Sequence, residues 1–96
     1  MSLKIIATPW AEETYTLLTA QLRQRWGDEF VNKFEAKIEK RIGAIMTSPH
    51  IYPVAEENMG LRKCVLHKNC SMLYKVDDEV ILIVCFWDNR QDPIIR

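Results

Sequence analysis

The sequence lacks most of the features that mark a specialised ligand site. It has only three glycines, and they are spread along the chain, so there is no glycine-rich loop of the kind that cradles a phosphate. The longest apolar run, over residues 80–87, is too short to cross a bilayer. The apolar residues near the N-terminus are also too few to form a signal peptide. We therefore expect a cytoplasmic protein that does not contact a membrane.

Cysteine is scarce and shows no paired pattern. Cys64, Cys70 and Cys85 are an odd number and form no Cys-x-x-Cys motif. This favours reduced thiols over a disulfide framework, and we assign all three to ordinary apolar packing. The histidines His50 and His67 show no metal-ligand spacing with each other or with the cysteines. We expect neither a metal ion nor another cofactor.

The chain has no excess of charge of either sign. Its 13 lysines and arginines balance 13 aspartates and glutamates, which excludes a globally basic nucleic-acid binder but not a local basic surface. With 48% apolar and 27% charged residues, the composition is typical of a globular protein. At 96 residues the chain is long enough for one domain, over residues 1–96.

Hydrophobic periodicity predicts an α+β fold for this domain. Thr8-Pro9 supplies an N-cap hydroxyl and a proline at the first helical position, while Gly27 ends this helix and Asp28 caps a second one. Because the connection between these two helices is so short, we expect them to form an antiparallel helical hairpin. The other predicted elements are an N-terminal strand at residues 3–7, a loop at 49–60 and a three-stranded antiparallel meander at 61–68, 70–76 and 80–87. We expect both helices to pack on one face of a single sheet.

The apolar stripes of the helices predict the core. We assign the helical aromatic residues, Trp10 and Trp26 among them, to these stripes, and we place Arg41 on the solvent side of the second helix. Residues 80–87 are apolar at every position, which predicts a central strand covered on both faces.

Cations gather without acidic residues in one part of the chain. Residues 59–75 contain no aspartate or glutamate, but they contain Arg62, Lys63, His67, Lys68 and Lys75. One interpretation is a surface that binds phosphates or acids. The alternative is that these are ordinary solubilising charges on an exposed hairpin, with His67 as a surface residue.

The turn of this hairpin decides which cations lie side by side. With a turn at Lys68-Asn69, Arg62 faces Lys75, and both point to a sheet face that the helices leave open. The same register places Cys64, Leu66, Ser71 and Leu73 on the open face, and Lys63, Val65, His67, Cys70, Met72 and Tyr74 on the other. Like charges directly opposite each other are destabilising unless an anion lies between them, so the pair predicts a binding site.

The last predicted strand is followed by Asp88 and Arg90. Their spacing allows an ion pair, and Arg90 would also reach the open face where the strand ends. We predict that Arg62, Lys75 and Arg90 contact a target or a partner protein.

Several short motifs occur in a fixed order along almost the whole chain. They are Pro9-Trp10-Ala11-Glu12-Glu13, Trp26-Gly27, Pro49, Gly60-Leu61-Arg62-Lys63, Leu73-Tyr74-Lys75-Val76-Asp77-Asp78 and Phe86-Trp87-Asp88-Asn89-Arg90-Gln91-Asp92-Pro93. Their order and spacing resemble the RelE/ParE superfamily, the toxins of bacterial type II toxin–antitoxin modules. The Asn-Arg-Gln-Asp-Pro ending is most similar to the ParE branch.

The two branches imply different functions. RelE-like members resemble ribosome-dependent mRNA endonucleases, and this resemblance implies Arg62, His67 and Arg90 as catalytic residues. The sequence departs from that branch at Cys64 and Ser71, where RelE-like proteins carry Lys and Arg, and it has no tyrosine after Arg90. ParE-like members instead resemble non-enzymatic toxins that bind DNA gyrase.

The resemblance thus favours a ParE-like toxin that binds a cellular target, with DNA gyrase as the candidate. It implies a cognate antitoxin whose acidic, disordered segment folds on binding. Under the RelE-like alternative the partners are the ribosome and its mRNA. A third alternative is a non-toxic remnant that keeps only antitoxin binding.

Overall fold

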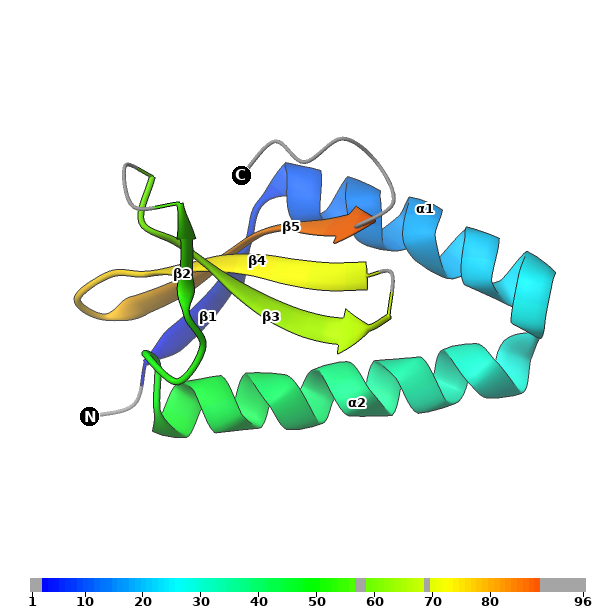
Figure 1. Ribbon diagram of the computed structural model, residues 1–96, viewed down its shortest axis with the longest axis horizontal. Helices are drawn as coiled ribbons and strands as arrows, with labels where there is room; N and C mark the ends of the chain where they lie inside the picture. The colour runs from blue at the N-terminus through cyan, green and yellow to red at the C-terminus, as the bar shows by residue number, and fades with distance from the viewer. Residues whose placement is uncertain (1–2, 57–58, 69, 89–96) are drawn as a thin grey trace.

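Two helices lie against one five-stranded sheet (Figure 1). The computed structural model describes residues 3–56, 59–68 and 70–88. The elements in chain order are β1 (Lys4–Ala7), α1 (Pro9–Trp26), α2 (Asp28–Thr47), β2 (Val54–Glu56), β3 (Leu61–His67), β4 (Cys70–Val76) and β5 (Val80–Asp88). The strand order is β1-β5-β4-β3-β2, in which β1 is parallel to β5 and the other neighbours are antiparallel. The predicted α+β class is confirmed.

The helical hairpin is fixed by residues at its ends. Thr8 Oγ1 accepts a hydrogen bond from the Ala11 backbone N–H at 2.9 Å, which confirms the predicted cap of α1. Gly27 has a φ of +91°, a conformation that glycine adopts without strain. The prediction that Asp28 caps α2 is wrong, because Asp28 is the first residue of that helix. Its carboxylate instead accepts a hydrogen bond from Arg23 Nε at 2.8 Å, across the link.

One strand is not predicted by the sequence. Residues 49–60 are expected to form a loop, but β2 lies within them and pairs antiparallel with β3, with Val54 opposite Arg62. This strand follows Pro53 and has only three residues, so it is too short to show a two-residue periodicity. It forms because β3 would otherwise be an unpaired sheet edge.

The core lies between the helices and one face of the sheet. Its buried residues are Ala11 of α1, Phe34, Ile38 and Ile45 of α2, and Cys64, Leu66, Cys70, Met72, Tyr74, Ile81, Ile83 and Phe86 of the sheet. The prediction that β5 is a central strand is confirmed, because it lies between β1 and β4 and none of its residues is exposed.

Two tryptophans that we assigned to the core are instead exposed. Trp26 is 57% exposed, because it is the last residue of α1 and the tip of the helical hairpin extends beyond the ends of the strands (Figure 1). It stacks on Phe30 with ring centroids 5.8 Å apart. Trp10 is 42% exposed, because it lies on a different side of α1 from the core-facing stripe.

The β3–β4 hairpin turns where predicted but pairs in a different register. Arg62 lies opposite Tyr74 and not opposite Lys75, so the predicted like-charged pair is wrong. An irregularity between Val65 and His67 shifts the pairing of the two strands by one residue. A local irregularity of this kind leaves no signal in the residue pattern that the turn assignment used.

This shift exchanges the two faces of β3, because side chains alternate along a strand. Cys64 and Leu66, predicted on the open face, lie in the core. Lys63 and Val65, predicted to face the helices, lie on the other face. The predicted faces of β4 are correct, since Cys70, Met72 and Tyr74 are core residues.

Helix α1 completes the edge of β5 beyond the end of β1. Strand β1 pairs only as far as Ala7 opposite Ile83. Farther along, Thr8 Oγ1 donates a hydrogen bond to the Val84 carbonyl at 2.6 Å, and Thr14 Oγ1 accepts one from the Phe86 N–H at 3.0 Å. The hydroxyls of the N-cap residue Thr8 and of Thr14 in α1 thus satisfy backbone groups that a longer β1 would have bonded.

Replacing Thr14 by valine keeps the branched shape and removes the hydroxyl. The Phe86 N–H then loses its acceptor, and we expect the free energy of unfolding to fall by about 1–2 kcal/mol. Urea denaturation followed by circular dichroism measures this change. Thr16→Val is the matched control, because the Thr16 hydroxyl only donates to the Glu12 carbonyl on the exposed side of the helix. An equal loss in both variants would contradict the role assigned to Thr14.

Candidate functional site

Helix α1 carries a second apolar face besides the one in the core. The core-facing stripe includes Ala11, which is buried, and Leu18, which packs against the core cluster. Roughly 100° around the helix axis lie Trp10 and Leu17, which are 42% and 58% exposed. With Thr14 between them, these residues recur every three or four positions and therefore form one stripe. The sequence analysis missed this stripe because it assigned Trp10 to the core.

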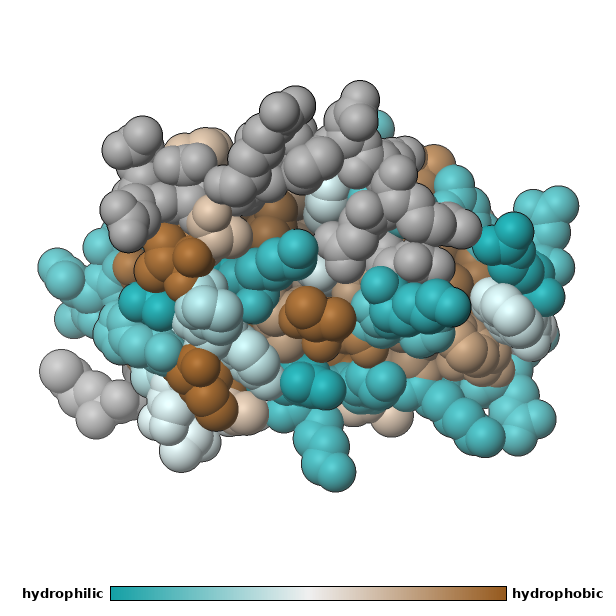
Figure 2. Space-filling view, in the orientation of Figure 1, coloured by the Kyte–Doolittle hydropathy of each residue, from teal (hydrophilic) through white to brown (hydrophobic). Residues whose placement is uncertain are grey.

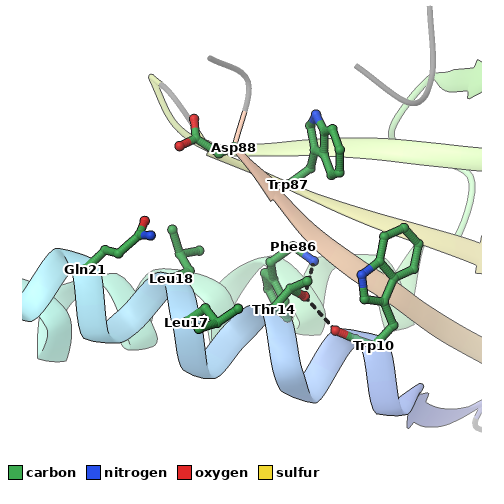
Figure 3. A pocket seen from close by; sticks show the side chains of 8 residues that line it. All are labelled: Trp10, Thr14, Leu17, Leu18, Gln21, Phe86, Trp87 and Asp88. Carbon is green, nitrogen blue, oxygen red and sulfur yellow. Dashed lines mark hydrogen bonds between the residues drawn. The ribbon is translucent and has the colours of Figure 1, made fainter. Parts of the chain in front are cut away.

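This second face forms one side of a groove of about 240 Å³ (Figure 3). Figure 3 shows side chains of α1 on one side and side chains from the end of β5 on the other. The lining residues are Trp10, Thr14, Leu17, Leu18, Gln21, Phe86, Trp87 and Asp88. The groove is thus largely apolar, with polar groups at Gln21 and Asp88.

Hydrogen bonds hold the wall of the groove in place. Thr14 Oγ1 donates to the Trp10 carbonyl at 2.8 Å while it accepts from the Phe86 N–H, so it ties α1 to β5 at the groove floor (Figure 3). The indole N–H of Trp87 is buried and has no hydrogen-bond partner among the described residues. A buried donor without an acceptor is destabilising, so the placement of this indole lowers the stability of the fold.

The face drawn in Figure 2 shows separate apolar patches among hydrophilic side chains. Single exposed apolar residues are ordinary on a protein surface, whereas a hollow with apolar walls is typical of a binding site. The α1–β5 groove is a candidate site because its walls include the exposed Trp10 and Leu17.

The predicted cation pair is divided between the two faces of the sheet. Arg62 lies on the helix side, where its Nη1 donates to the Tyr52 carbonyl at 2.7 Å. Lys75 is exposed on the opposite face. It lies two residues after Leu73, and Leu73 is the residue that pairs with Lys63. Lys63 and Lys75 are therefore the cations that share a face, as diagonal neighbours. That face is not fully open, since Leu73 and Ser71 beside them are buried.

The proposed catalytic residues are also dispersed. His67 packs edge-on against Phe30, with ring centroids 5.7 Å apart, at the far end of β3 from Arg62. The two residues are five positions apart on the strand, which is roughly 17 Å. Arg90, and with it the predicted ion pair to Asp88, lies outside the described residues.

Arg41, predicted on the solvent side, belongs to a cluster around Tyr52. Its Nη1 donates to the Tyr52 hydroxyl at 3.1 Å, while Tyr74 on β4 donates its own hydroxyl to the Pro49 carbonyl at 3.0 Å. These contacts and the Arg62 bond hold residues 49–53 against the sheet. The sequence gives no signal for the cluster, because its members are far apart along the chain and Tyr52 lies in a predicted loop.

The three cysteines are free and buried, as the packing assignment predicts. Among the described residues, no group of three or more His, Cys, Asp or Glu side chains is arranged to hold a metal ion. The described helices include none that is long and apolar enough to span a membrane.

Burial raises the pKa of Cys85 to about 11 and that of Cys70 to about 12, and the Asp88 carboxylate contributes to the shift of Cys70. An unfolded thiol ionises near pH 8.5, at about its ordinary value. Above that pH the unfolded chain loses protons that the folded chain keeps, so the free energy of unfolding falls as the pH rises. We expect Cys85→Ala to show a shallower fall than wild type between about pH 8.5 and 10.5 in urea titrations. Parallel curves would contradict this assignment.

Arg62 and Lys75 are expected to respond differently to loss of charge. Arg62→Gln should lower the free energy of unfolding by about 1–2 kcal/mol, because the Tyr52 carbonyl loses a charged donor. Lys75→Gln should stay within about 0.5 kcal/mol of wild type. Urea denaturation of both variants measures the difference. If Lys75 lay opposite Arg62, its neutralisation would instead stabilise the fold.

Solved structures of toxin–antitoxin proteins share this fold. A chain of the chromosomal ParDE toxin–antitoxin system from P. aeruginosa matches with a TM-score of 0.73 and 16% identity, over 90% of this chain and 95% of that chain. YafQ from E. coli matches with a TM-score of 0.61 and 12% identity, over 92% of this chain and 94% of that chain. A chain of the YoeB–YefM complex from Staphylococcus aureus matches with a TM-score of 0.60 and 20% identity, over 88% and 94%.

No protein-family model and no curated protein matches the sequence. The structural likeness nevertheless extends over nearly the full length of this chain and of the matched chains. Apart from the additional strand β2, the observed elements follow one another in the predicted order. The chain therefore shares the fold of these solved chains of toxin–antitoxin proteins.

Proposed function

We propose that this chain is the toxin of a type II toxin–antitoxin pair and that the α1–β5 groove receives a segment of its antitoxin. The observation that carries the proposal is the exposed stripe of Trp10 and Leu17, which the core does not use. The fold supports it, because the similar structures include toxin–antitoxin complexes. A protein of this fold with an unused apolar groove is suited to bind a partner chain.

The dimensions of the groove favour an amphipathic helix as its occupant. Trp10 and Leu17 are seven residues apart, which is about 10 Å along the helix axis. A partner helix presents apolar residues at the same spacing, on one face over two turns. Burying each large apolar side chain contributes about 1.5–3 kcal/mol. The acidic antitoxin segment implied by the family resemblance would place its charges outside this apolar contact.

We further propose that the toxin acts by binding its target and not by cleaving RNA, with DNA gyrase as the target in a bacterial cytoplasm. The distance of Arg62 from His67 supports a non-catalytic role. So does the burial of Cys64 and Ser71, which stand where RelE-like proteins carry Lys and Arg. We keep three proposed contacts of the target or antitoxin, namely Arg62, Lys75 and Arg90. Of the two that the structure describes, Arg62 and Lys75, it is Lys75 that is exposed.

The test is inducible expression in bacteria, with and without the product of the adjacent reading frame as the antitoxin. Wild type should arrest growth, and co-expression should restore it. Leu17→Glu places a charge in the groove, so it should still arrest growth but lose rescue by at least tenfold in colony counts. Thr16→Glu, on the exposed opposite side of α1, is the matched control and should still be rescued.

Two further measurements distinguish the alternatives. Intact transcripts with inhibited DNA supercoiling would support a gyrase-directed toxin, whereas cleavage of translated mRNA in primer extension would favour the RelE-like endonuclease. Normal growth on induction, with antitoxin still bound in a pull-down, would identify a non-toxic remnant. Rescue of Leu17→Glu as efficient as that of wild type would remove the groove from the proposal.

A further inference from the structure

Helix α1 has a second hollow beside it, on the opposite flank from the α1–β5 groove. At about 100° per residue, Trp10 and Glu12 lie on opposite sides of the core-facing Ala11, and Glu12 lines this second hollow. Its volume is about 210 Å³, and its lining residues are Ala7, Ala11, Glu12, Tyr15, Ile83 and Phe86. Because Tyr15 also reaches α2, we call it the helix-pair pocket.

The pocket opens to solvent above a buried floor. The two helices diverge from the Gly27 link, and the pocket lies beside the end of α1 that is farther from this link (Figure 1). Ala11 and Ile83 are 1% and 5% exposed, whereas Ala7 and Glu12 are exposed. The two alanines stand where β1 leads into α1, and their small side chains leave the space above the floor unfilled.

The walls of the pocket are apolar. The Tyr15 hydroxyl donates to the Glu35 carboxylate on α2 at 2.7 Å, so the ring is the part of Tyr15 that a ligand can contact. This ring packs against Phe86 with centroids 5.1 Å apart. The volume is below the about 300–1,000 Å³ of ordinary small-molecule pockets, so it suits a single inserted side chain.

Carboxylates from both helices surround this apolar hollow. Glu12 lines it, and Glu35 holds the Tyr15 hydroxyl. Burial raises the pKa of Tyr15, and the negative charges of Glu35 and Glu39 raise it further, so Glu39 also lies nearby. Arg23 acts on Tyr15 in the opposite direction, but its guanidinium already takes part in an ion pair. Within residues 3–56, 59–68 and 70–88, the ion pairs include none of the three carboxylates.

We propose that the helix-pair pocket binds a basic segment of a partner protein, which inserts one large apolar side chain flanked by lysines or arginines. The apolar side chain covers Ala11 and Ile83, and the cations lie against Glu12, Glu35 and Glu39. The same carboxylates would repel an acidic segment, so this partner differs in charge from the antitoxin segment proposed for the α1–β5 groove. The two proposals are independent, since the hollows lie on opposite flanks of α1.

Three short peptides test the chemistry of the occupant. The probe is acetyl-Lys-Lys-Leu-Lys-Lys-amide, and its controls carry alanine in place of leucine or glutamate in place of every lysine. In NMR titrations of the full chain, the probe should bind saturably and shift the methyl signals of Ala7, Ala11 and Ile83. The alanine peptide should bind about tenfold more weakly, because no large apolar side chain enters the pocket. The glutamate peptide should not bind.

Two of these results would overturn the proposal. Equal binding of the leucine and alanine peptides would mean that the apolar hollow is not used. Shifts centred on Leu17 would place the probe in the other groove.

Two variants separate the apolar from the electrostatic contribution. Ala7→Leu fills the hollow without a change of charge and should weaken binding of the probe at least tenfold. Circular dichroism checks that this variant is folded, and if it is not, the alanine peptide measures the same contribution. Glu12→Gln combined with Glu39→Gln removes two negative charges and should weaken binding at least threefold. Wild-type affinity in either variant, if folded, would contradict the proposal.

A matched control removes the same net charge elsewhere. Glu13→Gln combined with Glu79→Gln neutralises exposed carboxylates that do not line the pocket, and it should bind the probe as wild type does. Equal weakening in the two double variants would show attraction to net charge only, and the proposal would be wrong.

Other occupants would give different results. A second copy of this chain would appear in sedimentation of the protein alone as a dimer that Ala7→Leu dissociates. Isoamylamine carries the leucine side chain and one cation, so its binding as tightly as the probe would identify a small-molecule site. Either result would overturn the assignment to a partner segment.

Discussion

The contact between α1 and the free edge of β5 is the constraint on which the rest of the structure depends. Strand β1 covers only part of this edge, and the hydroxyls of Thr8 and Thr14 bond the backbone groups that follow. These bonds fix how α1 is rotated about its axis. The stripe that contains Ala11 then faces the sheet, and the stripe that contains Trp10 and Leu17 must face outward. The groove is therefore a consequence of how the sheet edge is satisfied.

The Tyr52 cluster has a comparable role at another sheet edge. Residues 49–53 are irregular, and their carbonyls are bonded by side chains of the sheet, Arg62 and Tyr74 among them. Arg41 bonds the Tyr52 hydroxyl from α2. Both arginines therefore hold the loop in place as part of the fold.

Local patterns predicted much of the architecture. The hydroxyl of Thr8, the conformational freedom of Gly27 and the apolar stripe of α2 each act through neighbours within a few residues, so the sequence was sufficient to place both helices. The central strand β5 was also evident from its continuous apolar run. The faces of β3 were not, because a single irregularity near Val65 reversed them. The same shift moved Arg62 away from Lys75 and removed the predicted cation pair.

By itself the sequence determined which segments become helices and strands and in what order, since capping, turn formation and hydrophobic periodicity are short-range effects. Only the tertiary structure decided which side chains meet. The pairing register, the three-residue strand β2 and the rotation of α1 depend on hydrogen bonds between residues as distant in sequence as Thr14 and Phe86. Each of these bonds uses at least one backbone group of a kind that every non-proline residue carries, so the side-chain pattern does not specify which residues they join.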